Sequence, residues 1–163
     1  MLLILSLKSC NFSTYGCHSP HTLLWIMMIV YVNLSYSGIE ARGFIFGPPI
    51  ALAIGAKFIP LRKPNKLPGE VISEKYILEY GSDCLEMHVG AVQSGDQAVV
   101  VDDLIATGGT LCAAINLLER AGAEVAECAC VIEVPDLKGR ERLKLHGKPL
   151  YVLVESQLEP TSK

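Results

Sequence analysis

The residue types best suited to chemistry gather in residues 99–110, which read VVVDDLIATGGT. The valine run predicts a buried strand, and Asp102 and Asp103 follow it directly. Ligands of open α/β sheets bind beyond the carboxyl ends of the strands. The two carboxylates are therefore expected to contact a polyol, or a ligand that carries magnesium, at that edge of a sheet.

A glycine-containing loop comes next and leads into a predicted helix. Glycines let backbone N–H groups approach a phosphate, and the N-terminus of the helix adds positive potential. This is not the P-loop pattern, because no lysine follows the second glycine. The alternative is a capped helix with two solvated aspartates. The residues expected to hold a phosphate are Ala106, Thr107, Gly108, Gly109 and Thr110.

Further charged candidates lie outside this stretch. Arg42 stands in a Glu-Ala-Arg-Gly loop, and residues 62–69 form a polar loop with two prolines and a glycine. The basic side chains of that loop are Arg62, Lys63 and Lys66. Glu79 precedes a Tyr-Gly pair at a predicted hairpin. Taken singly, each has a plainer interpretation as a solvated surface residue.

The elements that must position these residues alternate along the chain. We expect a short loop at residues 40–43, a helix that begins around Pro48, and a strand at residues 57–61. Alternating apolar residues predict a hairpin with its turn at residues 81–83. Strands are then expected at 97–101, 124–134 and 150–154, with a helix carrying Leu111 to Leu118 and a short basic helix from Pro135. This order predicts an α/β fold with a mostly parallel sheet flanked by helices.

The amino-acid composition excludes some classes of function and favours others. The chain has 163 residues, half of them hydrophobic, and a net charge of -3, which fits one packed domain and argues against binding nucleic acid through bulk charge. None of its six cysteines forms a Cys-x-x-Cys pair, and Cys128 and Cys130 alternate within an apolar stretch. They are expected to be strand residues of the core, in a reducing compartment such as the cytoplasm.

The motif at residues 99–110 resembles the phosphoribosyl-pyrophosphate signature of type I phosphoribosyltransferases. Residues 40–49 (EARGFIFGPP), Arg62-Lys63 with residues 66–69 (KLPG), and residues 77–81 (ILEYG) resemble the adenine phosphoribosyltransferases, most nearly the plant forms. The resemblance covers roughly residues 38–156. It implies the type I phosphoribosyltransferase fold with a hairpin lid, drawn from residues 65–80, and a cytoplasmic homodimer.

The resemblance also implies a reaction and a role for each candidate. Adenine and phosphoribosyl pyrophosphate would give AMP and pyrophosphate, with Mg²⁺ held through the substrate and possibly by Asp102 and Asp103. Residues 106–110 would bind the 5′-phosphate, and the two aspartates the ribose hydroxyls. Glu79 would be the acid/base candidate, and a non-proline cis peptide is expected near Glu40-Ala41. The pyrophosphate would meet Arg42, Lys63 and, in addition, Arg62 and Lys66.

The opening of the chain departs from the family. Residues 1–37 show none of the family's helix, Phe-Pro-x-Pro-Gly-type segment and first strand, so we divide the chain into this apolar segment, a domain at 38–158 and a tail at 159–163. Residues 30–32 could replace the missing strand. The apolar run at 23–32 is too short to span a membrane, although a targeting or anchoring role stays open.

This departure keeps two further functions open. One is a module that binds phosphoribosyl pyrophosphate without turnover, since the adenine pocket has no evident replacement. The other is a phosphoribosyltransferase for hypoxanthine or xanthine, against which the Glu79-Tyr80 sequence speaks.

Overall fold

The computed structural model describes residues 34–78 and 81–156, and residues 1–33, 79–80 and 157–163 lie outside the description. The expected strand at 30–32, the tail at 159–163 and Glu79 therefore lie outside the described residues. The first described element, β1 (Leu34–Ile39), begins within the segment that the sequence analysis set apart.

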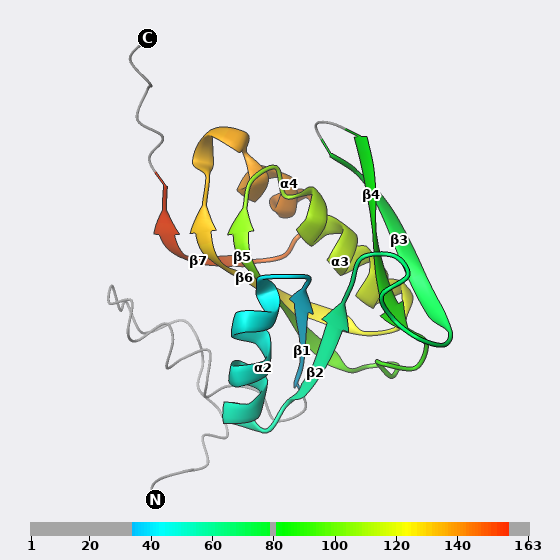
Figure 1. The fold of residues 1–163 in the computed structure, drawn as a ribbon. Coiled ribbons are helices and arrows are strands. Elements are labelled where there is room, and N and C mark those ends of the chain that lie inside the picture. Colours follow the sequence, from blue (N-terminus) through cyan, green and yellow to red (C-terminus); the bar gives the residue numbers. More distant parts are fainter. Residues whose placement is uncertain (1–33, 79–80, 157–163) are drawn as a thin grey trace, which may run out of the picture.

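A parallel sheet of five strands forms the centre of the fold, in the order β2-β1-β5-β6-β7 (Figure 1). The strands besides β1 are β2 (Lys57–Leu61), β5 (Gln97–Ile105), β6 (Glu124–Glu133) and β7 (Leu150–Glu155). All four neighbouring pairs run parallel. The predicted α/β class is confirmed.

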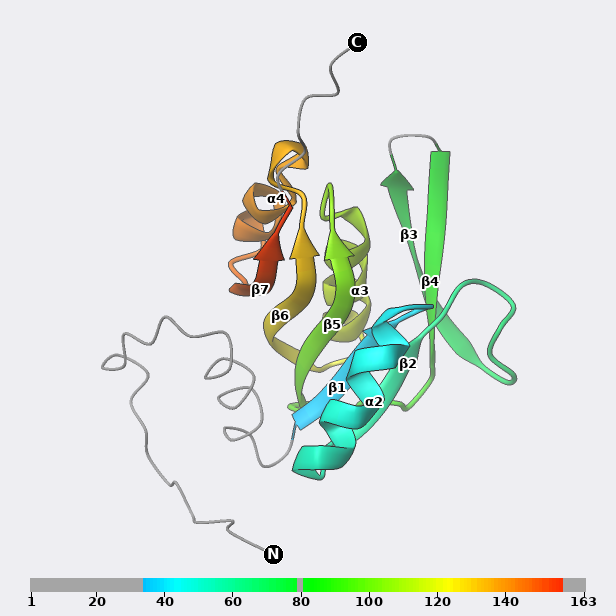
Figure 2. The same ribbon diagram turned by 60° about the vertical axis from the view of Figure 1, so that its left-hand side comes forward.

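Helices lie on both faces of this sheet (Figure 2). Helix α2 (Gly43–Ile54) packs on β1, β2 and β5. The other face carries α3 (Gly109–Arg120) and the short α4 (Gly139–Leu145), which follows a 3-10 turn at Pro135–Leu137. Strand β5 is buried from both sides: Val99 and Val101 join the cluster under α2, whereas Ala98 and Val100 join the larger core under α3. The run of valines is therefore explained by the central position of β5, which is covered on both faces.

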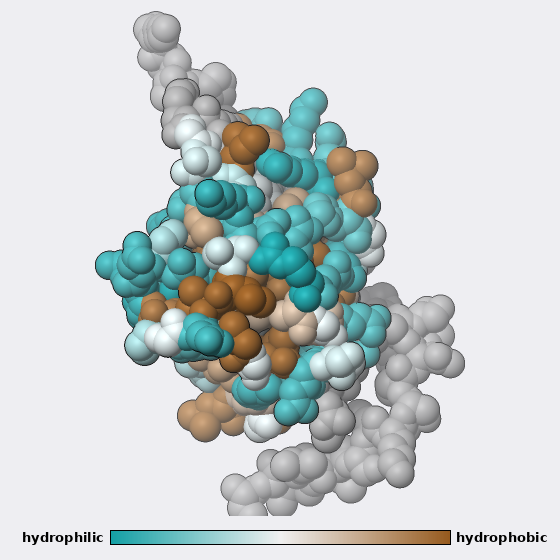
Figure 3. Space-filling view, turned by 90° about the vertical axis from the view of Figure 1, so that its right-hand side faces the viewer, coloured by the Kyte–Doolittle hydropathy of each residue, from teal (hydrophilic) through white to brown (hydrophobic). Residues whose placement is uncertain are grey.

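The predicted hairpin is confirmed as β3 (Val71–Leu78) and β4 (Gly81–His88), an antiparallel pair separate from the main sheet. Its turn was expected at residues 81–83, but Leu78 pairs with Gly81, so the connection is two residues earlier. The side of the molecule that carries the hairpin is largely hydrophilic around a central group of hydrophobic residues (Figure 3). Arg120 on α3 fastens the hairpin through an ion pair with Glu74 at 2.5 Å.

Two other boundaries differ from the sequence expectations. Helix α2 begins at Gly43, and Pro48 and Pro49 lie inside it. Each proline removes one helical hydrogen bond, so local sequence favours a later start. Packing of Phe46, Ile50 and Ala51 against β5 outweighs that loss. Strand β5 likewise continues through the two aspartates to Ile105, because β6 still pairs with it there.

Cys128 and Cys130 lie on β6 and are buried in the core, as expected. Burial raises the pKa of the Cys128 thiol to about 12, so this thiol stays protonated and inert. Within the described residues, no helix is long and apolar enough to cross a membrane.

Candidate functional site

The two aspartates of β5 differ sharply in environment. Asp102 is buried, with 8% of its surface exposed, and its Oδ1 accepts the backbone N–H of Asp103 at 2.9 Å. Burial is the main reason that the pKa of Asp102 rises to about 7, and the neighbouring Asp103 carboxylate raises it further. Asp103 is only partly buried. The pair therefore places a buried carboxyl group, that of Asp102, beside the partly exposed carboxyl group of Asp103 near the carboxyl end of β5.

Arg42 approaches this pair from the turn ahead of α2. Its Nε lies 3.0 Å from Asp103 Oδ2, and its side chain is 72% exposed. An exposed ion pair of this kind contributes roughly 0–1 kcal/mol, so the guanidinium can turn toward a ligand at little cost. The expected cis peptide between Glu40 and Ala41 is confirmed in the same turn.

The loop after β5 has the geometry of an anion site. Gly108 has a φ of 75°, and a Cβ at this position would lie 2.9 Å from the Gly139 carbonyl oxygen, so only glycine fits. Helix α3 starts at the next residue, and no side chain caps its N-terminus. The N–H groups of its first turn and the helix dipole are thus directed at the loop, as phosphate binding requires.

A basic residue that the sequence analysis did not single out borders this loop. Arg142 on α4 lies with Nη1 3.4 Å from the position that a Cβ on Gly109 would take. Burial raises the pKa of the Cys112 thiol, and the positive charge of Arg142 offsets part of that rise. Its helix was predicted to be basic, but only the packing of α4 against α3 brings this guanidinium to the anion site.

The basic loop after β2 is held by a second residue that the sequence did not single out. Glu40 accepts two hydrogen bonds from Arg62, at 3.2 Å from Nε and 3.1 Å from Nη2, and one from the Lys63 N–H at 2.8 Å. Arg62 Nη1 donates to the Lys66 carbonyl at 3.1 Å. The bond from Arg62 is the main reason that the pKa of Glu40 lies below its ordinary value.

The Lys63 side chain points at the hairpin. Its Nζ donates to Tyr76 Oη at 2.9 Å, pairs with Asp83 and lies 5.5 Å from the Tyr76 ring centroid. Burial alone would lower the pKa of Lys63, but the bonds to Asp83 and Tyr76 raise it overall. Among the expected pyrophosphate ligands, Arg42 faces the aspartates, whereas Arg62 and Lys63 are engaged within the protein and Lys66 is exposed.

A metal ion has one suitable pair of donors here. In the described part of the chain, no group of three or more His, Cys, Asp or Glu side chains converges on a point. Asp102 and Asp103 nevertheless offer carboxylate oxygens at the sheet edge beside the anion loop. Mg²⁺ commonly uses one or two carboxylates together with phosphate oxygens and water, so these residues fit a magnesium held largely by its ligand.

Comparisons with known proteins agree with this geometry. Residues 37–157 match the family described as "Phosphoribosyl transferase domain". The chain is similar to two Arabidopsis thaliana proteins, adenine phosphoribosyltransferase 3 (80% identical over 73% of this chain) and adenine phosphoribosyltransferase 4 (81% over 76%). The matches span 64% and 68% of those relatives, so this chain corresponds to about two thirds of their length.

A solved structure is also similar. It is an adenine phosphoribosyltransferase from Saccharomyces cerevisiae, complexed with adenine and a dideoxy-imino-altritol bisphosphate. It is 40% identical, has a TM-score of 0.74, and the match covers 83% of this chain and 76% of that one.

Proposed function

Because this chain belongs to the phosphoribosyltransferase family and, within it, to the adenine phosphoribosyltransferases, we propose that it converts adenine and phosphoribosyl pyrophosphate to AMP and pyrophosphate. The observation that carries this proposal is the meeting of Asp102, Asp103 and Arg42 with the anion loop at residues 106–110. These groups are of the types that bind the hydroxyls, the phosphate and the charged leaving group of a phosphorylated sugar.

Each part of the sugar has a partner in this arrangement. The 5′-phosphate lies against the N–H groups and hydroxyls of residues 106–110, with Arg142 adding positive charge. Asp102 and Asp103 accept hydrogen bonds from the ribose hydroxyls. Burial raises the pKa of Asp102 to about 7, and a cation or hydroxyl donor bound beside this carboxyl would lower its pKa and favour the ionised form. Together these contacts orient the ring before reaction.

The chemical step exchanges one bond at the anomeric carbon for another. The bond from this carbon to pyrophosphate breaks, a bond to an adenine nitrogen forms, and positive charge develops on the ribose. Negative charge accumulates on the departing oxygens, where Arg42 and the basic loop residues Arg62, Lys63 and Lys66 supply compensating charge. Glu79, which lies outside the described residues, is the proposed group that exchanges a proton with adenine.

Magnesium is the proposed cofactor, with Asp102 and Asp103 as its candidate protein contacts. When bound, it would neutralise charge on the pyrophosphate oxygens. The hairpin with its preceding loop is the proposed lid, which keeps water from the reactive sugar. Its anchor to the basic loop is the contact of Lys63 with Tyr76 and Asp83.

The decisive experiment measures AMP formation from radiolabelled adenine by the purified 163-residue chain, with phosphoribosyl pyrophosphate and Mg²⁺. AMP production, abolished or strongly reduced in Asp103→Asn, supports the proposal. A parallel assay with hypoxanthine and xanthine identifies the base, and preference for either one contradicts the assignment to adenine.

Binding of phosphoribosyl pyrophosphate without turnover is the outcome that would contradict the proposed reaction. In that case calorimetry would detect binding of phosphoribosyl pyrophosphate that depends on Asp103, and the radiolabel assay would yield no AMP.

We also propose that the protein acts as a cytoplasmic homodimer. Analytical ultracentrifugation tests the dimer, and a fluorescent fusion examined by microscopy tests the compartment. A monomer that forms AMP, or a fusion that enters an organelle, contradicts the respective proposal.

A further inference from the structure

A buried ion pair that the proposed reaction does not use ties α4 to the sheet. Glu133, the last residue of β6, is 4% exposed. Its two carboxylate oxygens accept hydrogen bonds from Arg140 Nε at 3.1 and 3.0 Å, and Arg140 Nη2 pairs with the same carboxylate. Arg140 Nη1 also donates to the Leu150 carbonyl oxygen at 3.2 Å. The guanidinium thus joins the second residue of α4 to both β6 and β7.

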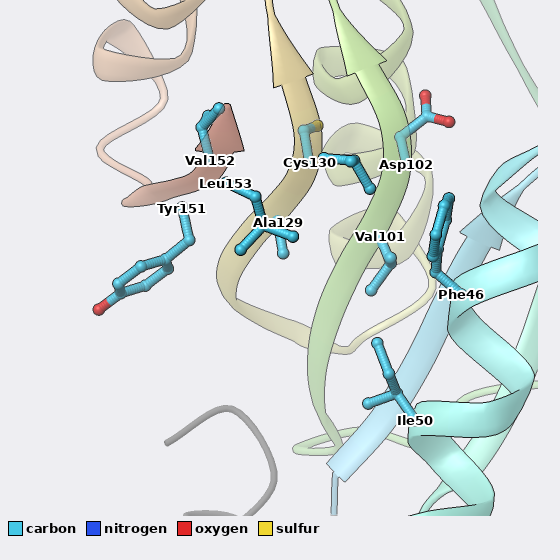
Figure 4. Close-up of a pocket in the computed structure, with 10 residues that line it drawn as sticks. Phe46, Ile50, Val101, Asp102, Ala129, Cys130, Tyr151, Val152 and Leu153 are labelled. Carbon is cyan, nitrogen blue, oxygen red and sulfur yellow. The ribbon is translucent and has the colours of Figure 1, made fainter. Parts of the chain in front are cut away.

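The ion pair lies beside the start of the anion loop. Asp102 of β5 and Cys130 of β6 are neighbours in the sheet (Figure 4). Three residues further along each strand, Ile105 pairs with Glu133. The next N–H, that of Val134, donates to the Ile105 carbonyl oxygen at 3.0 Å. Since the anion loop begins directly after Ile105, Glu133 is fixed next to the first residue of this loop.

Residues close to Arg140 in α4 contact the anion loop. Gly139 lies against it, because a Cβ on Gly108 would lie 2.9 Å from the Gly139 carbonyl oxygen. Arg142 lies beside it, with Nη1 3.4 Å from the position that a Cβ on Gly109 would take. Because both contacts are made by near neighbours of Arg140, a shift of Arg140 would move both of them.

The ion pair is not needed to keep α4 attached to the protein. Leu143 of the same helix is 1% exposed and belongs to the main core. Burial of two charges costs desolvation, which offsets much of their attraction, so a buried ion pair adds little stability over an apolar pair of similar volume. What the pair does supply is orientation, because the planar guanidinium binds a carboxylate in a fixed, two-pronged geometry.

We propose that Glu133 and Arg140 are positioning residues for the anion loop. Their ion pair holds Gly139 against the loop and Arg142 beside it, in the arrangement that binds the 5′-phosphate of a sugar. Both act through the loop and not by contact with the sugar phosphate. This role rests on the proposed function in one respect, the assignment of the 5′-phosphate to residues 106–110.

The test replaces both partners at once, so that no buried charge is left without its partner. The double variant Glu133→Leu with Arg140→Met should keep the stability of the unmodified chain in thermal unfolding. Its affinity for ribose 5-phosphate, measured by titration calorimetry, should fall by roughly tenfold. The matched control, Glu119→Leu with Lys148→Met, removes an ion pair of 2.7 Å near the far end of α3 and should leave this affinity unchanged.

A double-mutant cycle separates positioning from a general effect on stability. In the unmodified chain, Arg142→Gln should weaken binding of ribose 5-phosphate severalfold. In the Glu133→Leu, Arg140→Met background the guanidinium of Arg142 is no longer directed at the loop, so the same substitution should change the affinity by less than about twofold. Fold changes that multiply in the triple variant would contradict the proposed role. A double variant that binds ribose 5-phosphate as tightly as the unmodified chain would also contradict it.

Arg140→Lys keeps the proposal testable if the double variant does not fold. Lysine retains the charge beside Glu133 but offers a single nitrogen in place of the fork that reaches both Glu133 and Leu150. The affinity for ribose 5-phosphate should therefore fall severalfold, and an unchanged affinity would overturn the proposal.

Failure of this role is distinguishable from failure of the proposed reaction. A chain that shows these effects on ribose 5-phosphate binding but forms no AMP contradicts the reaction and supports the role of the ion pair. A chain that forms AMP while the double variant and Arg140→Lys bind ribose 5-phosphate normally supports the reaction and contradicts the role of the ion pair.

Discussion

The guanidinium of Arg62 is oriented by Glu40, from 22 residues earlier in the chain, through hydrogen bonds of 3.2 and 3.1 Å. The same carboxylate accepts the N–H of Lys63 at 2.8 Å. The partly buried Glu40 thus links the turn that carries Arg42 to the loop that carries the other basic candidates. Glu40 is a positioning residue, since its carboxylate is directed at the protein and not at the open site.

The first prediction concerns the pH dependence of this contact. The pKa of Glu40 in the folded protein lies below the ordinary value of 4.5, chiefly because of Arg62. A lowered folded pKa means that the contribution to stability is fully present above about pH 4.5 and is lost as the pH falls through the folded pKa. We expect Glu40→Gln to lower the free energy of unfolding by about 1 kcal/mol at pH 7, and by progressively less in acid. Urea unfolding at pH 7 and in acid measures the free energy of unfolding, and Glu70→Gln, at an exposed residue, is the control. A loss that is the same at pH 7 and in acid would contradict it.

The second prediction concerns the ribose contacts. Asp103→Asn retains size but removes the charge, so the affinity for phosphoribosyl pyrophosphate should fall by roughly tenfold, as expected for the loss of a charged hydrogen bond. Titration calorimetry measures the affinity. Asp96→Asn is the control, because Asp96 pairs with Lys57 at 3.4 Å at the amino end of the same strand. Unchanged affinity in Asp103→Asn would refute the assigned role of the carboxylates.

The third prediction uses the packing of α4 beneath the anion loop. A Cβ on Gly139 would collide with the Ala106 carbonyl oxygen and would lie 2.7 Å from Ile105 Cγ1. Gly139→Ala should therefore cost about 1–3 kcal/mol of stability and weaken AMP binding, because Ala106 must move. Thermal unfolding with and without AMP measures both effects. Glu141→Ala, a change at an exposed residue of the same helix, is the control. A Gly139→Ala variant with normal stability and AMP binding would show that the close contact between Gly139 and Ala106 does not position the loop.

The fourth prediction separates two roles of Lys63. If its ammonium group contacts the pyrophosphate, Lys63→Ala should raise the KM for phosphoribosyl pyrophosphate by about tenfold. Asp83→Asn, which removes the partner that holds Lys63 in the structure, should leave that KM unchanged or lower it. Equal increases in both variants would mean that Lys63 acts only by fastening the hairpin.

The fifth prediction tests the charge that Arg142 brings to the anion loop. Arg142→Gln should weaken AMP binding severalfold, and the effect should shrink with added salt because the side chain is exposed. Arg120→Gln removes a similar charge from the far end of α3, where it contacts Glu74, and is the matched control. Equal effects of the two variants would indicate general electrostatics without a local contact.

Much of the fold could be predicted because its signals are local. The valine run of β5, the alternation in β3 and β4, and the glycine after α3 indicate their elements without any knowledge of neighbours. The predicted boundaries of helices and strands were wrong where packing opposed the local preference of the sequence. Helix α2 includes Pro48 and Pro49 because its apolar side chains are buried against β5. The start of that helix also depends on close approach, since a Cβ on Gly43 would lie 2.8 Å from the Val101 carbonyl oxygen.

The candidate site likewise has one part that the sequence predicts and another that depends on tertiary packing. The sequence alone determined the aspartate pair and the glycine loop, because strand, loop and helix N-terminus are contiguous in residues 97–120 and their chemistry follows from their order. Only the tertiary structure decided that Asp102 is buried while Asp103 meets Arg42, that Glu40 orients Arg62, and that Arg142 reaches the anion loop. Those relationships join residues far apart in the chain. They arise from the way α2 and α4 pack on opposite faces of the sheet, which local sequence does not encode.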